Sequence, residues 1–179
     1  SVTAVPDEKV HVELTWTNPE DPNENDEDGS DVDVHMAKMG VGHWFEAPYD
    51  VYYQNPMNNW NPETPSLDID DTDGAGPENI QMDDPQQCQW YSVGVHYFSQ
   101  LYGTAYATVR IYINNNLVYE KLNKPLKNGG QFWDVARIHW PTGQVYDVDT
   151  MQPAPPTDQK PVVSESMKSS GLCTAQELY

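Results

Sequence analysis

The sequence predicts an all-β protein, an antiparallel β-sandwich of the jelly-roll or immunoglobulin-like kind with long acidic loops and an extended C-terminal tail. Apolar residues recur at every second position almost wherever they are patterned, which is the period of a strand with one buried face. Seven or eight such segments, rich in Tyr, Trp and Val, are separated by turn signals. No convincing amphipathic helix of ten or more residues competes with this interpretation.

The first two expected strands lie near the N-terminus. In residues 9–17 every even position is apolar and every odd position is polar or charged. Residues 31–36 alternate in the same way, with valines at positions 32 and 34. Because side chains two apart on a strand face the same side, we expect Asp31 and Asp33 to share the face opposite the valines.

The later strands are expected in the second half of the chain. Residues 90–98 alternate, and residues 105–122 are predicted to form a hairpin. Its turn is at 114–116, where three asparagines tolerate positive φ. Residues 133–148 contain two further alternating segments on either side of Pro141-Thr142-Gly143, another turn signal.

Two long connections and a tail complete the domain organisation. Residues 18–30 form an acidic loop, and residues 54–90 have little strand character. A connection of that length inside a compact domain is usually functional. We expect residues 1–150 to form a calcium-binding β-sandwich domain and residues 151–179 to form a Pro- and Ser-rich tail. That tail packs either on its own domain or on a neighbouring molecule.

The charge of the chain limits its partners. Twenty-eight acidic residues stand against nine basic ones, a net charge of -19 with a pI near 4.2. Nucleic acids and anionic membranes would be repelled, so neither is expected as a partner. No apolar run approaches the ~20 residues that span a bilayer, so no membrane insertion is expected. The chain begins without Met, as an exported and processed protein would, which predicts an extracellular or cell-surface location.

Residues 65–80, "PSLDIDDTDGAGPENI", concentrate acidic side chains and glycines. Ca²⁺ takes six to eight oxygen ligands from carboxylates, amides and carbonyls, and glycines allow the backbone to fold around an ion. We expect this loop to meet the end of the strand at 31–36 and to hold one or two Ca²⁺ ions. The candidate metal ligands are Asp31, Asp33, Asp68, Asp70, Asp71, Asp73 and Glu78. The alternative is a solvated acidic loop that binds no ion.

Other ligand types are less well represented. Five scattered histidines do not form a zinc motif, and His35 and His96 are expected to be surface or hydrogen-bonded residues. Cys88 and Cys173 are the two cysteines of the chain. A disulfide between them would tie the tail to the body, but the count of two leaves both their pairing and their compartment open.

Six segments of the chain, in order, are "SDVDVHM", "WFEAPYDVYYQNPMNNWN", "PSLDIDDTDGAGPENI", "YSVGVHYF", "ATVRIYINNNLVYE" and "WDVARIHWPTGQV". Together they resemble a bacterial exported domain family of YfaP-like proteins, found on cell-surface proteins of myxobacteria and related groups. The resemblance covers roughly residues 8–148. It implies an exported β-sandwich, often one module of a larger surface protein, with the Asp cluster as a metal site. Members often carry cysteines where this chain has "YDVYYQNP", so a Cys88–Cys173 bond would be particular to this protein.

Three functions compete. The first is an extracellular calcium-binding structural or adhesion module that binds a partner surface or polymerises, with "QKPVV" or "SVTAV" completing the sheet of the next copy. The second is carbohydrate binding, with Trp60 stacking on a sugar between Asn58 and Asn59, and with Trp44, Tyr52 and Tyr53 extending the platform. A tryptophan in a long loop also serves as an anchor that buries the loop.

The third candidate is an enzyme of the glycosidase type, with Asp70 and Asp73 as acid and base. The acids outnumber what such a pair requires, and the chain has no G-x-S-x-G motif and no P-loop. No catalytic residues are therefore predicted. The calcium-binding structural or adhesion module is the preferred hypothesis.

Overall fold

The computed structural model describes residues 8–26, 28–68, 70–71 and 75–168. Almost all regular structure in these residues is β, which confirms the predicted fold class. The elements are β1 (Val10–Thr17), β2 (Asp31–Lys38), β3 (Asp50–Val51), β4 (Ser66–Leu67), β5 (Glu78–Met82), β6 (Gln89–Ser99), β7 (Ala105–Ile113), β8 (Asn116–Leu126), β9 (Phe132–Trp140), β10 (Gln144–Gln152) and the short helix α1 (Glu165–Lys168).

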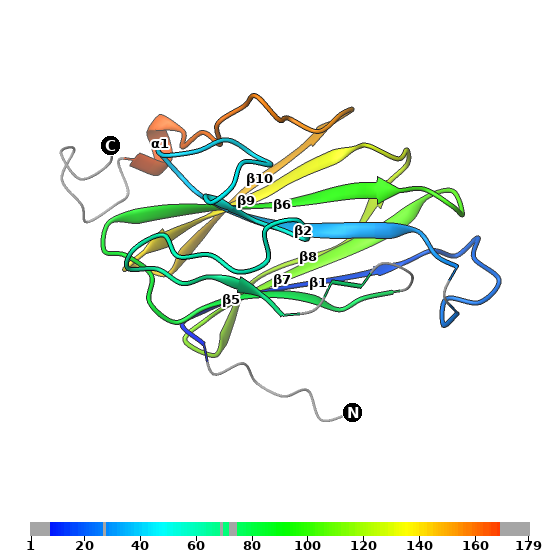
Figure 1. Cartoon of the computed structure of the whole chain (residues 1–179), viewed down its shortest axis with the longest axis horizontal. Helices are drawn as coiled ribbons and strands as arrows, with labels where there is room; N and C mark the ends of the chain where they lie inside the picture. Colours follow the sequence, from blue (N-terminus) through cyan, green and yellow to red (C-terminus); the bar gives the residue numbers. More distant parts are fainter. Residues whose placement is uncertain (1–7, 27, 69, 72–74, 169–179) are drawn as a thin grey trace.

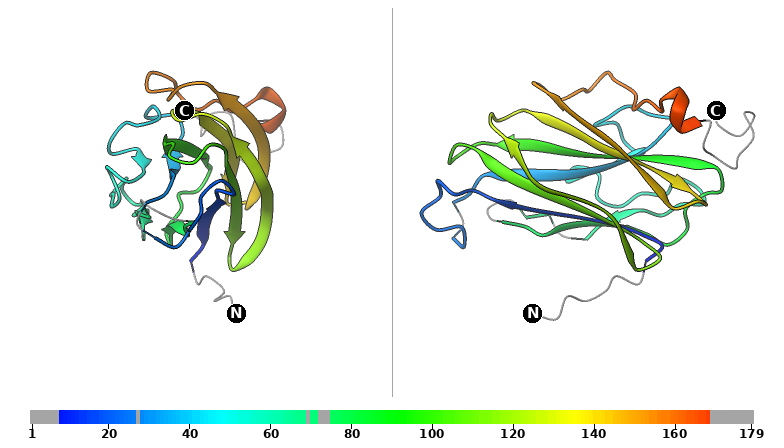
Figure 2. Two further views of the ribbon diagram at one scale, coloured as in Figure 1. Left: turned by 90° about the vertical axis from the view of Figure 1, so that its right-hand side faces the viewer. Right: turned by 180° about the vertical axis from the view of Figure 1, so that it is seen from behind.

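The strands form two antiparallel five-stranded sheets. One sheet has the order β4-β5-β1-β7-β8 and the other the order β10-β9-β6-β2-β3. Figure 1 shows them as two layers, with β2, β6, β9 and β10 above β5, β1, β7 and β8. The edge strands β8 and β10 lie on the same side of the molecule (Figure 2, right). The long chain segments between strands therefore gather mainly on the opposite side, around β2 and β5.

The core lies between the two sheets and follows the predicted alternation. The even positions of β1 are buried, and the odd positions are half-buried or exposed. The valines and Met36 of β2 join the same core. However, every residue of β2 is buried, because the segments after it cover its outer face as well. Asp33 and His35 therefore lie on a covered face of the sheet rather than on an open one.

Both predicted turns are present. Asn114 and Asn115 have φ values of 47° and 67° between β7 and β8, so the hairpin begins where the asparagines predict it. Gly143, with φ of 68°, closes the turn between β9 and β10. Local residue chemistry is sufficient at both places because the paired strands are neighbours in the sequence.

The segment 54–90 contains more structure than its composition predicts. β5 pairs with β1, from Val10 opposite Met82 to Leu14 opposite Glu78, and β4 pairs with β5. Only five residues long and preceded by Gly76-Pro77, β5 shows little alternation of its own in the sequence. Its pairing with a strand more than sixty residues away brings the acidic loop against the sandwich.

The described part of the tail packs on its own domain. The backbone N–H of Trp44 donates to the carbonyl of Gln159 at 3.2 Å. The Arg137 Nε–H donates to the carbonyl of Val162 at 2.9 Å, and Asp134 holds the same guanidinium. β10 ends at Gln152, slightly beyond the predicted boundary at 150. Of the two packing modes left open by the sequence, residues 153–168 therefore adopt the intramolecular one.

Two further predictions concern the pairing of the cysteines and membrane insertion. Cys88 is disulfide-bonded, and its expected partner Cys173 lies outside the described residues, so the pairing stays a prediction. In the part of the chain that the structure describes, no helix is long and apolar enough to cross a membrane.

Candidate metal centre

Glu78 is the innermost carboxylate of the acidic segment. It is fully buried at the start of β5, and its side chain reaches from one sheet to the other. The Val34 N–H of β2 donates to Glu78 Oε2 at 2.7 Å, and the Asp71 N–H donates to Oε1 at 3.2 Å. β3 pairs with β2 only at Met36 and Ala37, so it does not reach Val34. The Val34 N–H therefore donates to the Glu78 carboxylate instead of to a neighbouring strand. The carboxylate thus joins β2, β5 and the intervening loop.

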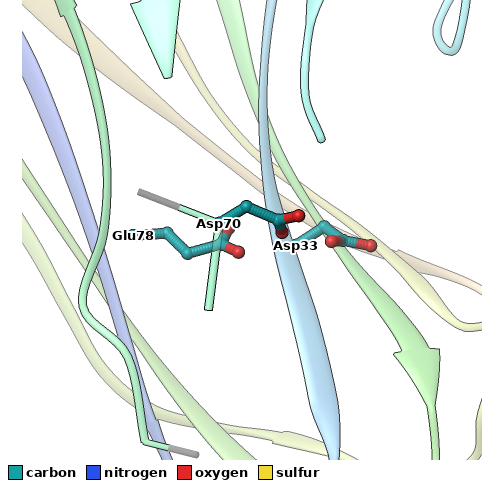
Figure 3. A group of neighbouring side chains, drawn as sticks. All are labelled: Asp33, Asp70 and Glu78. Carbon is teal, nitrogen blue, oxygen red and sulfur yellow. The ribbon is translucent and has the colours of Figure 1, made fainter. Parts of the chain in front are cut away.

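Asp33 and Asp70 complete a cluster with Glu78. One carboxylate oxygen from each of the three residues lies within 4.8 Å of the other two. Figure 3 shows the three side chains in a row, with Asp70 between Glu78 and Asp33. Asp33 is 2% exposed, whereas Asp70 is open to solvent. The cluster therefore has a closed inner end and an accessible outer end.

Asp33 carries a buried oxygen that is not satisfied. Its Oδ2 atom has no hydrogen-bond partner among the described residues. The nearest cationic candidate is Nδ1 of His96, at 3.6 Å, which is too long for a hydrogen bond. His96 lies directly opposite Asp33 on β6, so the pair is a cross-strand neighbour contact. An orphaned carboxylate oxygen inside a protein costs free energy unless a cation or a donor meets it.

The charges within the cluster are not compensated by basic side chains. Among the described residues, no lysine or arginine forms an ion pair with Asp33, Asp70 or Glu78. Burial, together with the nearby charges of Asp33 and Asp70, raises the pKa of Glu78 to about 9, against the opposing effect of the two backbone N–H groups. Burial and the charge of Asp33 also raise the pKa of Asp70. Either a proton or an added cation is needed to relieve this repulsion.

The donor set suits a hard divalent cation. All three groups offer carboxylate oxygens, which Ca²⁺ and Mg²⁺ prefer, and neither sulfur nor a converging imidazole is part of the cluster. Three carboxylates supply three oxygens if each binds through one atom, and six only if all three are bidentate, whereas Ca²⁺ takes six to eight. Because Asp70 faces solvent, the remaining positions would be filled from that side by water or by a ligand.

The backbone at Ala75 and Gly76, just before β5, lies close against Trp16 of β1. Gly76 has a φ of +77°, and a side chain there would come within 2.9 Å of the Trp16 ring. The carbonyl of Ala75 accepts a hydrogen bond from the Trp16 N–H at 3.1 Å. A glycine is therefore required at position 76 for this backbone to pack against β1, and this packing places Glu78, two residues later, in the interior.

The structure divides the predicted metal ligands into groups. It brings together Asp33, Asp70 and Glu78, which the sequence placed in two separate segments. Asp31 is buried on β2 but is not part of the cluster, and the exposed Asp68 uses its N–H to pair with the Asn79 carbonyl. Asp71 contributes its backbone N–H to Glu78. Asp73 lies outside the described residues.

The prediction of a sugar platform at Trp60 is wrong. Trp60 is 5% exposed, its ring stacks on Tyr91 with centroids 6.2 Å apart, and its Nε1–H donates to the Pro48 carbonyl. Asn58 donates to the Asn55 carbonyl, and Asn59 accepts from the Asn61 N–H, so both amides are used within the loop. The anchor interpretation of this tryptophan is correct. Of the three proposed extensions, Trp44 and Tyr52 are buried as well, and Tyr53 is half-buried.

His35 and His96 are expected from the sequence to be surface or hydrogen-bonded residues, and both are buried. The hydrogen-bonded alternative is confirmed for His35, whereas neither ring nitrogen of His96 has a hydrogen-bond partner among the described residues. His35 Nδ1 is 2.8 Å from Asp50 Oδ2, and its ring stacks on Tyr52. They are buried because later segments of the chain cover the outer face of β2. The alternation within β2 shows which residues share a face but not whether that face is covered.

Sequence reasoning missed a second buried ionic group. Lys38 Nζ donates to Glu63 Oε2 at 2.8 Å and to Gln86 Oε1 at 3.0 Å. Tyr91 donates to the other oxygen of Glu63 at 3.0 Å. The sequence does contain a signal for this group. Lys38 occupies the next even position of β2 after the apolar Val32, Val34 and Met36, so its side chain points to the same side as theirs. Unlike the cluster around Glu78, this carboxylate has its own cation.

Comparisons with known proteins add little to this geometry. No protein-family model matches the chain, and no curated protein matches it. Among solved structures, the chain is similar to one described as "Crystal structure of unknown function protein SAV2460". The TM-score is 0.47 and the identity is 16%, over 84% of this chain and 91% of that one.

Proposed function

We propose that this protein is a calcium-binding β-sandwich module with a structural or adhesive role outside the cell. The observation that carries the proposal is the convergence of Asp33, Asp70 and Glu78, with one buried Asp33 oxygen left without a partner. A Ca²⁺ ion there would neutralise the carboxylates and join β2 of one sheet to β5 of the other. The ion would thus stabilise the sandwich by linking its two sheets.

The extracellular location is supported by the acidic composition and by the resemblance to exported domains. Free Ca²⁺ is abundant outside cells, where sites of modest affinity are filled. Self-assembly through "QKPVV" gains no support from the fold, because Pro161 is buried and Val162 accepts a hydrogen bond from Arg137 of its own domain. An exchange of this segment would first require the release of those contacts.

The experiment that tests the proposal compares thermal unfolding in EDTA, in millimolar Mg²⁺ and in millimolar Ca²⁺. A ligand at a hundred times its Kd adds about 2.7 kcal/mol. For a chain of this size that corresponds to a rise in Tm of about 5–10 °C. Mg²⁺ is expected to give a smaller shift, since it demands octahedral geometry and releases its waters reluctantly. Light scattering in the same samples reports calcium-dependent self-assembly.

Two variants with the same change in charge locate the ion. Asp33→Asn is expected to abolish the calcium shift, because it removes the inner carboxylate of the cluster. Asp147→Asn on β10 is the matched control and is expected to keep the full shift, since that carboxylate accepts from Tyr119 far from the cluster. A wild-type Tm that is the same in Ca²⁺ and in EDTA would refute the proposal and leave a shared proton as the occupant of the cluster.

A further inference from the structure

The outer end of the cluster borders a pair of accessible aromatic rings, Tyr53 and Phe98. Phe98 is 47% exposed, and Tyr53 is partly exposed just beyond β3. Their ring centroids are 5.3 Å apart with an interplanar angle of 62°. Unlike Trp60, these rings are not buried by their own loop. They form what we term the aromatic rim, defined as Tyr53 and Phe98.

The aromatic rim lies beside the carboxylates on the same face of the sheet. Asp33 and His96 are direct neighbours across β2 and β6, and Phe98 follows His96 by two residues, so all three face the same side. The Phe98 and His96 ring centroids are 5.9 Å apart, and His96 Nδ1 lies 3.6 Å from Asp33. The charges of Asp33, Asp31 and Asp70, after burial, raise the pKa of Tyr53, as expected for a phenol close to the acids.

We propose that the ion held by Asp33, Asp70 and Glu78 acts with the aromatic rim as a calcium-dependent binding site for a neutral saccharide. This inference rests on the proposed function and names the ligand of the same site. Two adjacent hydroxyls of the sugar would complete the coordination that three carboxylates leave open on the Asp70 side. The apolar C–H face of the sugar would lie on Phe98 and Tyr53.

Neutral sugars fit this site better than acidic ones. The chain carries a net charge of -19, and Asp31 lies two residues before Asp33 on β2 and adds to the negative charge that acts on Tyr53. One divalent cation does not reverse the sign of that surface, so an anionic glycan would be repelled. A neutral polyol offers oxygen ligands without adding charge, and its ring carbons match the aromatic rim.

The test is affinity gel electrophoresis of the full chain in gels that contain mannan, galactan or dextran, with polygalacturonate as the anionic probe. Wild-type protein is expected to be retarded by at least one neutral polysaccharide in millimolar Ca²⁺ and to migrate freely in EDTA. Phe98→Ala and Tyr53→Ala are expected to weaken that retardation about fivefold, the order expected for one lost aromatic contact. Their calcium-dependent rise in Tm is expected to remain.

Leu122→Ala is the matched control, because Leu122 is 55% exposed on β8 of the other sheet. It is expected to bind like wild type. The inference would be overturned if no neutral polysaccharide retarded the protein, or if the retardation persisted in EDTA or in Phe98→Ala. In each of these cases a calcium-dependent rise in Tm would still support the proposed function. Retardation by polygalacturonate alone would overturn the assignment to neutral sugars. Loss of the calcium shift itself would overturn both.

Discussion

Two regions of this protein place acidic side chains close together and treat them in opposite ways. At the edge where β8 meets β10, Asp149 accepts from Lys124 at 2.7 Å and lies 3.0 Å from Lys121. In the cluster around Glu78, three carboxylates converge and no lysine or arginine among the described residues joins them. The first region is neutralised by lysines of the chain itself, whereas the second has no such basic partner among the described residues.

The pKa values of the two regions move in opposite directions. Burial alone would raise the pKa of Asp149, but hydrogen bonds from Lys124 and Lys121 lower it below its usual range. Burial and like charges raise the pKa of Glu78 to about 9. The comparison shows that burial does not decide the outcome by itself, because the presence of a cation reverses the direction of the shift. The two regions can therefore be separated by charge substitution and by pH.

The largest expected effect follows from replacing Glu78. Its pKa is raised on folding, so its contribution to the free energy of unfolding is fully present below about pH 4.5 and is lost as the pH rises toward about 9. In EDTA at pH 8, Glu78→Gln is expected to stabilise the protein by a few kcal/mol, because the neutral amide needs no proton uptake on folding, a gain reduced by the loss of one of the two acceptors for the Val34 and Asp71 N–H groups. Urea unfolding of both proteins from pH 5 to pH 9 measures this. A wild-type stability that does not fall over that range would contradict the pKa direction.

A built-in cation would remove the difference between the regions. Asp70 is exposed, so Asp70→Lys can place an ammonium group at the outer end of the cluster without burying a new side chain. We expect this variant to gain about 1–2 kcal/mol in EDTA and to lose its response to Ca²⁺. Thermal unfolding with and without Ca²⁺ is the measurement, and Asp70→Asn separates removal of the acid from addition of the base.

The lysine-paired region is expected to respond with the opposite sign. Asp149→Asn removes the acceptor shared by Lys121, Lys124 and the Trp133 Nε1–H, and should destabilise the protein by about 1 kcal/mol. The contribution of Asp149 is present above its unfolded pKa of about 3.9 and is lost as the pH falls through its lower folded pKa. Urea unfolding at pH 7 and pH 3 tests this. A stabilising effect at pH 7 would show that the pairing does not outweigh burial.

The smallest effect is expected at Asp68, an acid near the cluster but outside it. Its side chain is exposed, and its backbone N–H pairs with the Asn79 carbonyl in any variant. Asp68→Asn is expected to change stability by less than about 0.5 kcal/mol and to leave the calcium shift intact. Differential scanning calorimetry in Ca²⁺ and EDTA checks both. A reduced calcium shift in this variant would extend the ligand set to the loop.

Parts of the candidate site were predictable because their chemistry is local. The alternation in β2 placed Asp31 and Asp33 on one face, and the acidic motif included Asp70 and Glu78. Their meeting depends on β5, whose pairing with β1 has no local signature. Which acids converge could therefore not be separated from those that remain outside, such as Asp68.

The sequence by itself determined the alternating strands β1, β2 and β6 to β10, the two hairpin turns and the excess of negative charge, because period-two alternation, asparagines with positive φ and composition act over a few residues. Only the tertiary structure decided that Trp60 is buried, that both faces of β2 are covered, and that Glu78 rather than a solvent-facing acid lies at the centre. Alternation shows which side chains share a face. What covers that face depends on contacts between distant segments, and burial then determines which carboxylates need a proton or a cation to offset their charge.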